Sequence, residues 1–220
     1  MKDIKDFFTG KITRKKLDEL IQPYSTEEKT LEVGSFGKPA YGKYFPNKIG
    51  LDLDAGAGVD IVGSVEDLPF DDNSFFCVVC ISVLEHVKDP KKAIAEMRRV
   101  LKPNHRLIFS VPFLFPLHET PRDFWRFTKY GLELLFEEGW EIEHFIVENS
   151  SQISLASLMQ RVAYQTKLKF NLFNKILILF CAKVLSLLPN LIKEEYGDIR
   201  HQKRGDVIFP SGYFLVIRKK

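Results

Sequence analysis

The sequence predicts an α/β protein with a mostly parallel sheet that carries helices on both faces. Over the first 150 residues, short apolar runs alternate with stretches of helical periodicity. The longest such run, Phe75–Val83, is apolar almost throughout and enriched in β-branched residues, which is typical of a strand buried on both faces. Strands that alternate with helices form parallel sheets through right-handed crossovers, and this order of elements predicts the fold class.

The chain opens with a predicted helical segment over residues 1–24, where apolar residues recur at helical spacing as far as Pro23. Three short apolar runs then predict the first strands, at Thr30–Val33, Ile49–Leu53 and Asp60–Val62. The interval between the first two runs leaves room only for a short crossover helix near residues 40–44.

Two further helices are marked by residues that begin and end them. After the central strand, Asp89 is an N-cap followed by a first-turn proline, and Pro103 is expected to stop this helix. Thr128 caps the second helix and Gly139 ends it. The strands that follow these helices are predicted at Arg106–Val111 and Trp140–Val147.

Residues 151–204 interrupt the alternation of strands and helices. A Ser-rich stretch leads into a strongly apolar, lysine-containing helical segment, which we interpret as a helical insertion or lid. The last strand, Tyr213–Ile217, then returns to the sheet. The predicted organisation is an α/β domain over residues 1–150 and 205–220 that carries this insertion.

Charge is distributed unevenly along the chain. Residues 1–150 hold 20 Lys and Arg against 25 Asp and Glu, whereas residues 151–220 hold 12 against 4. Between Leu168 and Ile192, 17 of 25 residues are apolar, with lysines among them. This pattern indicates either peripheral contact of residues 165–195 with a membrane surface or a lid or homodimer helix packed on the domain.

Composition excludes several classes of protein. Hydrophobic residues at 45% and charged residues at 28% are ordinary globular values. The three cysteines suit a reducing compartment, and no run approaches the roughly 18 apolar residues needed to span a bilayer. The mixed-charge N-terminus has no apolar signal region, so the expected location is cytoplasmic, with membrane association as an option.

A glycine-containing turn and a strand-end carboxylate point to a nucleoside cofactor. Residues 32–37, Glu-Val-Gly-Ser-Phe-Gly, lead from the first strand, and glycine permits positive φ and close approach of a ligand. Twenty residues after Glu32, Asp52 ends the second strand, where a carboxylate can accept both ribose hydroxyl hydrogens. Each feature alone also has a purely structural explanation.

Four sequence blocks then follow in order: Asp67-Leu68-Pro69-Phe70, Asp72-Asn73-Ser74-Phe75, Val83-Leu84-Glu85-His86-Val87 and Arg99-Val100-Leu101-Lys102-Pro103. This series closely resembles the class I S-adenosylmethionine-dependent methyltransferases, in particular their type 11-like small-molecule group. The resemblance covers residues 30 to about 148 and the final strand. It implies a Rossmann-like, seven-stranded sheet and methyl transfer from S-adenosylmethionine to a small-molecule or lipid-linked acceptor, with a sugar or glycan hydroxyl as the favoured acceptor.

The resemblance also implies which residues bind the cofactor. They lie at the ends of the first four strands: Glu32, Gly34, Ser35 and Gly37 at the first, Asp52 and Leu53 at the second, Ser64 and Val65 after the third, and Ile81 and Ser82 at the fourth. The chain departs from the family pattern at Phe36, Lys38 and Ser64. These departures keep open a second interpretation, a methyltransferase-like binding module without catalytic activity.

Acceptor chemistry is expected after the fifth strand, in the segment from Pro112 to Thr128, which is similar to the family's HxxPxDYxRYT block. His118 is the predicted general base because its ordinary pKa lies near the working pH, and His86 is a second candidate. Arg122, Asp123 and Arg126 could orient a polar acceptor. The alternatives are structural: Asp123 and Arg126 form an ion pair that braces the loop, and His86 caps the next helix.

Two patterns suggest other chemistry, and both are short. Cys77 and Cys80 have C-x-x-C spacing but lie within an apolar strand, so we expect buried hydrophobic side chains without a redox or zinc role. Asp52 and Asp54 mimic the metal-binding D-x-D of nucleotide-sugar glycosyltransferases, which supplies a less favoured enzyme class. No metal site is predicted, and no basic stripe with interleaved aromatic residues suggests a nucleic-acid partner.

Overall fold

The computed structural model describes residues 15–37, 41–169, 171–188, 191–195 and 207–220. The chain forms two compact units. The larger one, called the sheet unit here, comprises Leu17–Phe113, Leu117–Ile146 and Tyr213–Lys220. The smaller one, the helical unit, contains Leu114–Pro116 and Val147–Gly212. The domain boundaries predicted from the sequence stay a prediction.

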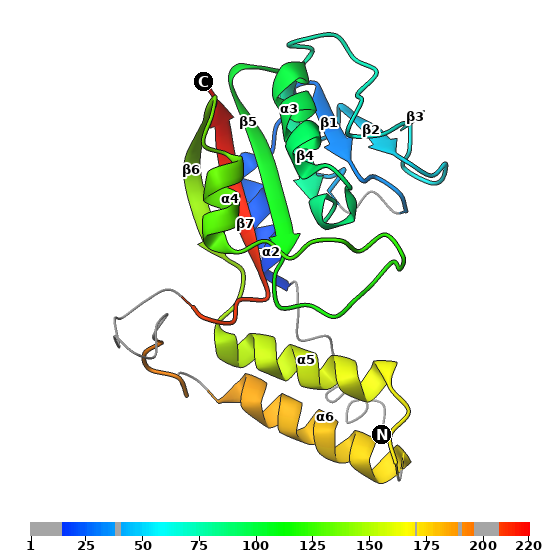
Figure 1. Cartoon of the computed structure of the whole chain (residues 1–220), viewed down its shortest axis with the longest axis vertical. Coiled ribbons are helices and arrows are strands. Elements are labelled where there is room, and N and C mark those ends of the chain that lie inside the picture. The colour runs from blue at the N-terminus through cyan, green and yellow to red at the C-terminus, as the bar shows by residue number, and fades with distance from the viewer. Residues whose placement is uncertain (1–14, 38–40, 170, 189–190, 196–206) are drawn as a thin grey trace. The chain divides into compact units, whose positions relative to one another are not determined.

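The sheet has seven strands in the order β3-β2-β1-β4-β5-β7-β6. The predicted fold class, a mostly parallel seven-stranded sheet with helices on both faces, is confirmed, whereas the strand order was not predicted. The strands are β1 (Thr30–Val33), β2 (Lys48–Asp52), β3 (Ile61–Val62), β4 (Phe75–Ile81), β5 (Leu101–Pro112), β6 (Trp140–Val147) and β7 (Gly212–Lys219). The first five pair in parallel, and β7 enters between β5 and β6 in the antiparallel direction (Figure 1). The carboxyl ends of β1 to β5 therefore meet at one edge.

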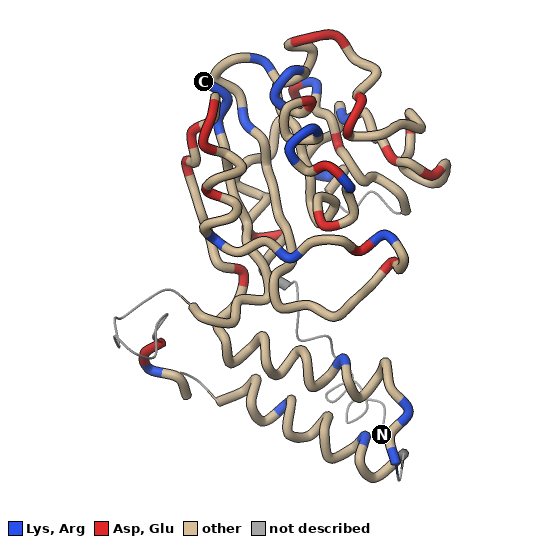
Figure 2. Tube along the Cα trace, in the orientation of Figure 1, with Lys and Arg blue, Asp and Glu red and all other residues tan. Residues whose placement is uncertain are grey.

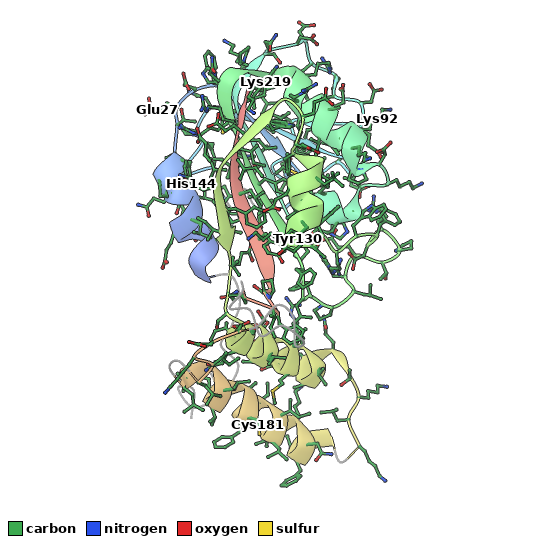
Figure 3. The ribbon with its side chains drawn as sticks, turned by 60° about the vertical axis from the view of Figure 1, so that its left-hand side comes forward. Glu27, Lys92, Tyr130, His144, Cys181 and Lys219 are labelled. Atoms are coloured by element: carbon green, nitrogen blue, oxygen red, sulfur yellow. The ribbon has the colours of Figure 1, made fainter. Side chains whose placement is uncertain are left out.

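Helices cover both faces of the sheet, because α2 (Lys15–Ile21) lies on one side and α3 (Pro90–Val100) and α4 (Lys129–Leu135) lie on the other (Figure 3). A short 3-10 turn, η1 (Gln22–Tyr24), follows α2. On the α2 side, apolar side chains from the helix, the sheet and the β1–β2 connection pack together: Leu17, Ile21, Phe45, Cys77, Val79, Ile108, Phe214 and Val216. The opposite face buries the apolar stripe of α3.

The predicted helix caps are present. The Asp89 side chain accepts a hydrogen bond from the Lys92 amide at 3.1 Å, and Thr128 accepts one from the Gly131 amide at 3.1 Å. Cys77 and Cys80 are buried in β4, and burial raises the pKa of the Cys77 thiol to about 12, so their interpretation as buried hydrophobic side chains is confirmed. Such thiols are poor nucleophiles at neutral pH.

Three local predictions differ from the structure or lie outside it. The strand β5 starts at Leu101 instead of Arg106, because Leu101 pairs with Phe75 while Arg106 pairs with Cys77, so the intervening residues bulge from the ladder. Pro103 lies in this bulge, where its missing N–H costs no ladder bond. Residues 41–44 form a turn and not a helix. Most of the predicted 1–24 segment, residues 1–14, lies outside the described residues.

The helical unit consists mainly of α5 (Ser151–Gln165) and α6 (Asn171–Leu187), which lie side by side (Figure 1). The sequence predicted α6 but not that the Ser-rich stretch is itself a helix, which the Ser150 side chain caps. Small and polar residues of α5, among them Ser154, Ala156 and Ala163, are buried. Gln152 joins the helices by donating to the carbonyl oxygens of Leu185, at 2.6 Å, and Leu188.

Among the described helices, none combines the length and the hydropathy that a membrane crossing requires.

The Arg99 guanidinium connects α3 to the segment between β3 and β4. It donates to the carbonyl oxygens of Leu68 at 2.9 Å and Phe70 at 2.7 Å, and it forms an ion pair with Asp72 at 2.8 Å. A second pair, with Glu96 at 2.8 Å, orients the guanidinium along its own helix. Three of the four motif blocks in the sequence, 67–70, 72–75 and 99–103, are therefore joined by one side chain.

Replacing Arg99 by Leu should lower the free energy of unfolding by about 2 kcal/mol, because two partly buried carbonyl groups lose a charged donor. Urea denaturation followed by circular dichroism measures the change. Lys91→Leu on the exposed face of the same helix is the control and should stay within about 0.5 kcal/mol of the original protein. Equal midpoints for the two variants would contradict this role of Arg99.

Candidate functional site

A cleft of about 790 Å³ opens at the carboxyl ends of β1, β2 and β4, within the sheet unit. Its walls come from five connections, each of which follows a parallel strand: residues 33–36, 51–54, 63–66, 82–88 and 119–124. The last belongs to the long β5–α4 connection, which extends beyond the strand ends (Figure 1). The volume lies within the range of roughly 300–1,000 Å³ that is usual for small-molecule sites.

Gly34 makes the turn after β1 possible. Its φ is +76°, its amide donates to the Leu51 carbonyl at 2.8 Å, and a Cβ built on it would lie 2.2 Å from the Val83 side chain. Neither the backbone conformation nor the space allows a side chain. The turn from β1 and the connection after β4 are therefore in direct contact, and both form walls of the cleft.

Asp52 lies at the end of β2 with its carboxylate fixed by two backbone amides. Oδ2 accepts from the Phe36 amide at 3.0 Å, and Oδ1 accepts from the Asp54 amide at 3.2 Å. These bonds link the β1 turn to the β2 end. Each carboxylate oxygen has further acceptor capacity, and the residue lines the cleft, so Asp52 can accept hydrogen bonds from a ligand.

The ten predicted cofactor residues divide into two groups. Six line the cleft: Gly34, Asp52, Leu53, Ser64, Val65 and Ser82. The other four lie outside its lining: Glu32, Ser35, Gly37 and Ile81. Glu32 is buried in β1 and ion-paired with Lys48, so its carboxylate links β1 to the start of β2.

Phe36, the departure from the family pattern, does not fill the cleft. The residue is 60% exposed, and its ring lies against Gly56, where a Cβ would approach the ring to 2.4 Å. Phe36 thus forms part of the cleft wall and leaves the carboxyl end of β2 accessible. Sequence reasoning assigned no site role to other lining residues: Lys88 follows the VLEHV block, and Thr120 and Pro121 lie within the segment that resembles the HxxPxDYxRYT block.

Two histidines and a glutamate gather where the β4 exit meets the β5–α4 connection. His86 ends the 3-10 turn η2 (Leu84–His86) and lines the cleft. Its ring packs edge to face against the ring of His118, with the two ring centroids 4.7 Å apart. The Nε2 atoms of both histidines lie 3.8 Å from Oε1 of Glu85, which is fully buried. Glu85 was not singled out from the sequence, because nothing in the VLEH block shows that its carboxylate is enclosed.

Of the predicted acceptor residues, Arg122 lines the cleft, where it forms an ion pair with Asp54 at 2.8 Å. Asp123 and Arg126 pair with each other through two bonds of 2.6 and 2.7 Å. The bonds from Arg126, helped by the His118 amide, lower the pKa of Asp123 to about 2 although partial burial acts in the opposite direction. The Asp123 carboxylate also lies 3.3 Å from His118 Nδ1, so the ion pair positions that ring.

The connection that carries these residues is fastened to η2 by backbone bonds. The Glu85 carbonyl accepts from the amides of Phe124, at 2.8 Å, and Trp125, at 3.2 Å, and the Trp125 indole donates to the Val87 carbonyl at 2.8 Å. Two backbone amides and the Trp125 indole thus hold the loop against the segment that follows β4.

A family model described as a methyltransferase domain matches residues 44–109. The ubiquinone/menaquinone biosynthesis C-methyltransferase UbiE of Klebsiella pneumoniae is 33% identical over 129 residues, which cover 52% of this chain and 51% of UbiE. UbiE of Vibrio cholerae is 30% identical over 132 residues, which cover 54% of this chain and 48% of UbiE. The chain thus spans about half the length of the curated relatives it matches.

Solved structures match nearly the whole chain. A S-adenosylmethionine-dependent methyltransferase of Thermotoga maritima, described as a possible histamine N-methyltransferase, aligns with a TM-score of 0.56 over 100% of this chain and 95% of its own, at 18% identity. This chain has the class I methyltransferase fold. The resemblance predicted from the sequence is confirmed. The [4+2]-cyclase SpnF aligns with the same TM-score over 93% of this chain and 80% of its own, also at 18% identity, so the methyltransferase fold alone does not fix the reaction.

The two glycines near the cleft allow a matched test of the contact with Val83. Both Gly34→Ala and Gly37→Ala place a side chain at positive φ, at a cost of roughly 1 kcal/mol, but among the residues that the structure describes no atom lies within 4 Å of a Cβ built at Gly37. Gly34→Ala should therefore destabilise the protein by about 1–3 kcal/mol more than Gly37→Ala. Adding Val83→Ala should recover part of that difference in urea denaturation, and equal stabilities of the two glycine variants would refute the contact.

Proposed function

We propose that this chain binds S-adenosylmethionine in the cleft and transfers its methyl group to a small-molecule or lipid-linked acceptor. The observation that carries the proposal is the Asp52 carboxylate, which two backbone amides hold at the end of β2 on the cleft wall. The methyltransferase-domain match and the UbiE relatives support the same reaction.

The residues of the cleft fit this cofactor in volume and chemistry. Asp52 would accept the two ribose hydroxyl hydrogens, and Leu53 and Val65 supply apolar contacts for the adenine. The Gly34 turn brings backbone close to the amino-acid end, while Ser64 and Ser82 offer hydroxyl groups along the same wall. When bound, S-adenosylmethionine supplies an activated sulfonium methyl, so the main task of the protein is to align the acceptor with it.

The acceptor is proposed to enter at the end of the cleft formed by residues 119–124, with a sugar or glycan hydroxyl as the favoured class. Arg122 and Glu119 line this end and can bind polar groups of the acceptor. His86 is the predicted base that reaches the cleft, and His118, held by the Asp123–Arg126 pair, lies directly behind it. A hydroxyl acceptor needs such a group near it because its proton must leave during transfer.

A second candidate is a binding module without methyltransferase activity. Phe36 favours it, because this bulky residue forms part of the wall beside Asp52 in place of a small one. The fold gives no support to the glycosyltransferase alternative, and the Asp54 carboxylate of its D-x-D pattern is paired with Arg122.

Isothermal titration with S-adenosylhomocysteine tests cofactor binding. Asp52→Ala should weaken binding by more than tenfold, since each hydrogen bond from a ribose hydroxyl to a carboxylate contributes roughly 1.5–3 kcal/mol. Asp71→Ala, an exposed carboxylate outside the cleft lining, is the matched control and should bind as the original protein does. Absence of binding by the original protein would reject the cofactor, and binding without turnover of any hydroxyl acceptor would favour the module.

We propose in addition that α6 contacts a lipid surface. Leu172, Phe173 and Phe180 are 72%, 71% and 51% exposed, and Ile176 and Leu187 add further exposed apolar area. Basic residues occur along α5 and α6 and acidic residues do not (Figure 2). Exposed apolar residues next to lysines and arginines are typical of helices that lie in the headgroup region of anionic membranes.

Co-sedimentation with phosphatidylglycerol vesicles tests this contact. The double variant Phe173→Ser/Phe180→Ser should lose most of the vesicle-bound fraction, because it removes apolar area from the exposed surface of α6. Tyr130→Ser/Leu134→Ser removes side chains that are 73% and 69% exposed on α4 and should bind vesicles as before. Equal binding by both double variants would reject the contact, and a dimer that dissociates only in the α6 variant would identify a second copy as the partner.

A further inference from the structure

We propose that Glu85, His86 and His118 bind one divalent transition-metal ion, with Zn²⁺ as the best fit. The three residues come from two elements, η2 and the β5–α4 connection, which the Phe124 and Trp125 amides hold together. The site lies beside the acceptor end of the cleft, because His86 is part of the cleft lining.

The possible ligand atoms are already close to one another. Oε1 of Glu85 lies 3.8 Å from Nε2 of His86 and 3.8 Å from Nε2 of His118, and one ligand atom from each residue lies within 4.8 Å of the other two. Tetrahedral Zn²⁺ with bonds of about 2.0–2.1 Å requires ligand atoms roughly 3.3 Å apart. The two distances to Glu85 need to shorten by about 0.5 Å, and the remaining separation, at most 4.8 Å, by up to about 1.5 Å, for the site to close around an ion.

Glu85 has the environment expected of a ligand. Its side chain is fully buried, and neither carboxylate oxygen has a hydrogen-bond partner among the residues that the structure describes. A buried carboxylate without hydrogen bonds is costly unless a cation is bound to it. Arg126 is the nearby cation and interacts with Glu85 electrostatically, but its guanidinium donates its hydrogen bonds to Asp123 and to the Trp125 carbonyl and none to the Glu85 carboxylate. A metal ion between Glu85 and the two Nε2 atoms would satisfy the carboxylate directly.

Each histidine is held in the tautomer that a metal ligand needs. Nδ1 of His86 lies 2.5 Å from the Arg122 carbonyl oxygen, which can only accept, so Nδ1 donates and Nε2 keeps its lone pair. Nδ1 of His118 lies 3.3 Å from the Asp123 carboxylate, which fixes that ring in the same way. Metal-binding histidines typically donate the other ring N–H to a carbonyl or a carboxylate.

The ligand set also indicates the class of metal. Two imidazoles and one carboxylate suit Zn²⁺ or Fe²⁺, and they do not suit Mg²⁺ or Ca²⁺, which prefer oxygen ligands. Three protein ligands leave one coordination position for an exogenous oxygen, as in catalytic zinc sites. Where the acceptor is a hydroxyl, an ion here would bind that oxygen and lower its pKa, so that its proton passes to water before the methyl group is transferred. In the metal-bound chain the ion would thus replace the base role proposed above for His86. This step rests on the proposed function, whereas metal binding does not.

Titration of the chelator-treated full chain with Zn²⁺ alone, followed by calorimetry, tests the site. We expect one equivalent to bind, and Glu85→Gln and His118→Gln should each weaken binding at least tenfold. The matched control is His144→Gln, an exposed histidine on β6, which should leave the affinity unchanged. Urea denaturation of each variant shows whether it folds; if Glu85→Gln does not, His86→Gln takes its place.

Co²⁺ provides an independent reading, because ligation by these residues should give a visible absorption band that is lost in His118→Gln and kept in His144→Gln. No saturable binding, or equal Zn²⁺ affinity in the original protein and in Glu85→Gln, would overturn the inference. Titration with S-adenosylhomocysteine in the same preparations separates the two proposals. Metal binding without cofactor binding would reject only the proposed function, and cofactor binding without metal binding would reject only this inference.

Discussion

The parallel pairing of β1 with both β2 and β4 is the constraint on which the cleft depends. Because the three strands run in one direction, their carboxyl ends reach the same edge, and the chain must turn sharply there. Gly34 allows that turn, because its backbone lies so close to Val83 that any side chain at position 34 would clash with it. The Phe36 amide, in the turn after β1, then donates a hydrogen bond to Asp52. The turn from β1 therefore orients the carboxylate at the end of β2.

Several residues of the ordered sequence blocks stabilise this sheet and its helices. Arg99 joins the segment that contains Leu68 and Phe70 to α3, and the Asp89 cap starts that helix. These contacts are far more informative about the fold than about the reaction. A cyclase shares the same architecture, which agrees with the view that the chemistry is set by side chains at the strand ends.

Sequence patterns predicted the elements whose cause is local. Apolar runs located the strands, and the Asp89 and Thr128 caps located two helices, because both signals depend on neighbours in the chain. The bulge that contains Pro103 depends on pairing with a distant strand and was missed. The enclosure of Glu85 was missed for the same reason, since it arises only when residues 117–126 fold over η2. Of the candidate site, strand-end residues were predictable and the glutamate behind the histidines was not.

The fastening of the β5–α4 connection has a consequence for how specificity could evolve. Its base is held by the Glu85 carbonyl and by the Trp125 indole, whereas Glu119 and Arg122 project from the part nearer the cleft. Exchanges at these outer positions would alter which molecules are admitted without disturbing the anchor. A cleft built in this way can change the set of ligands that it accepts one surface residue at a time, while the interior of the sheet unit stays unchanged.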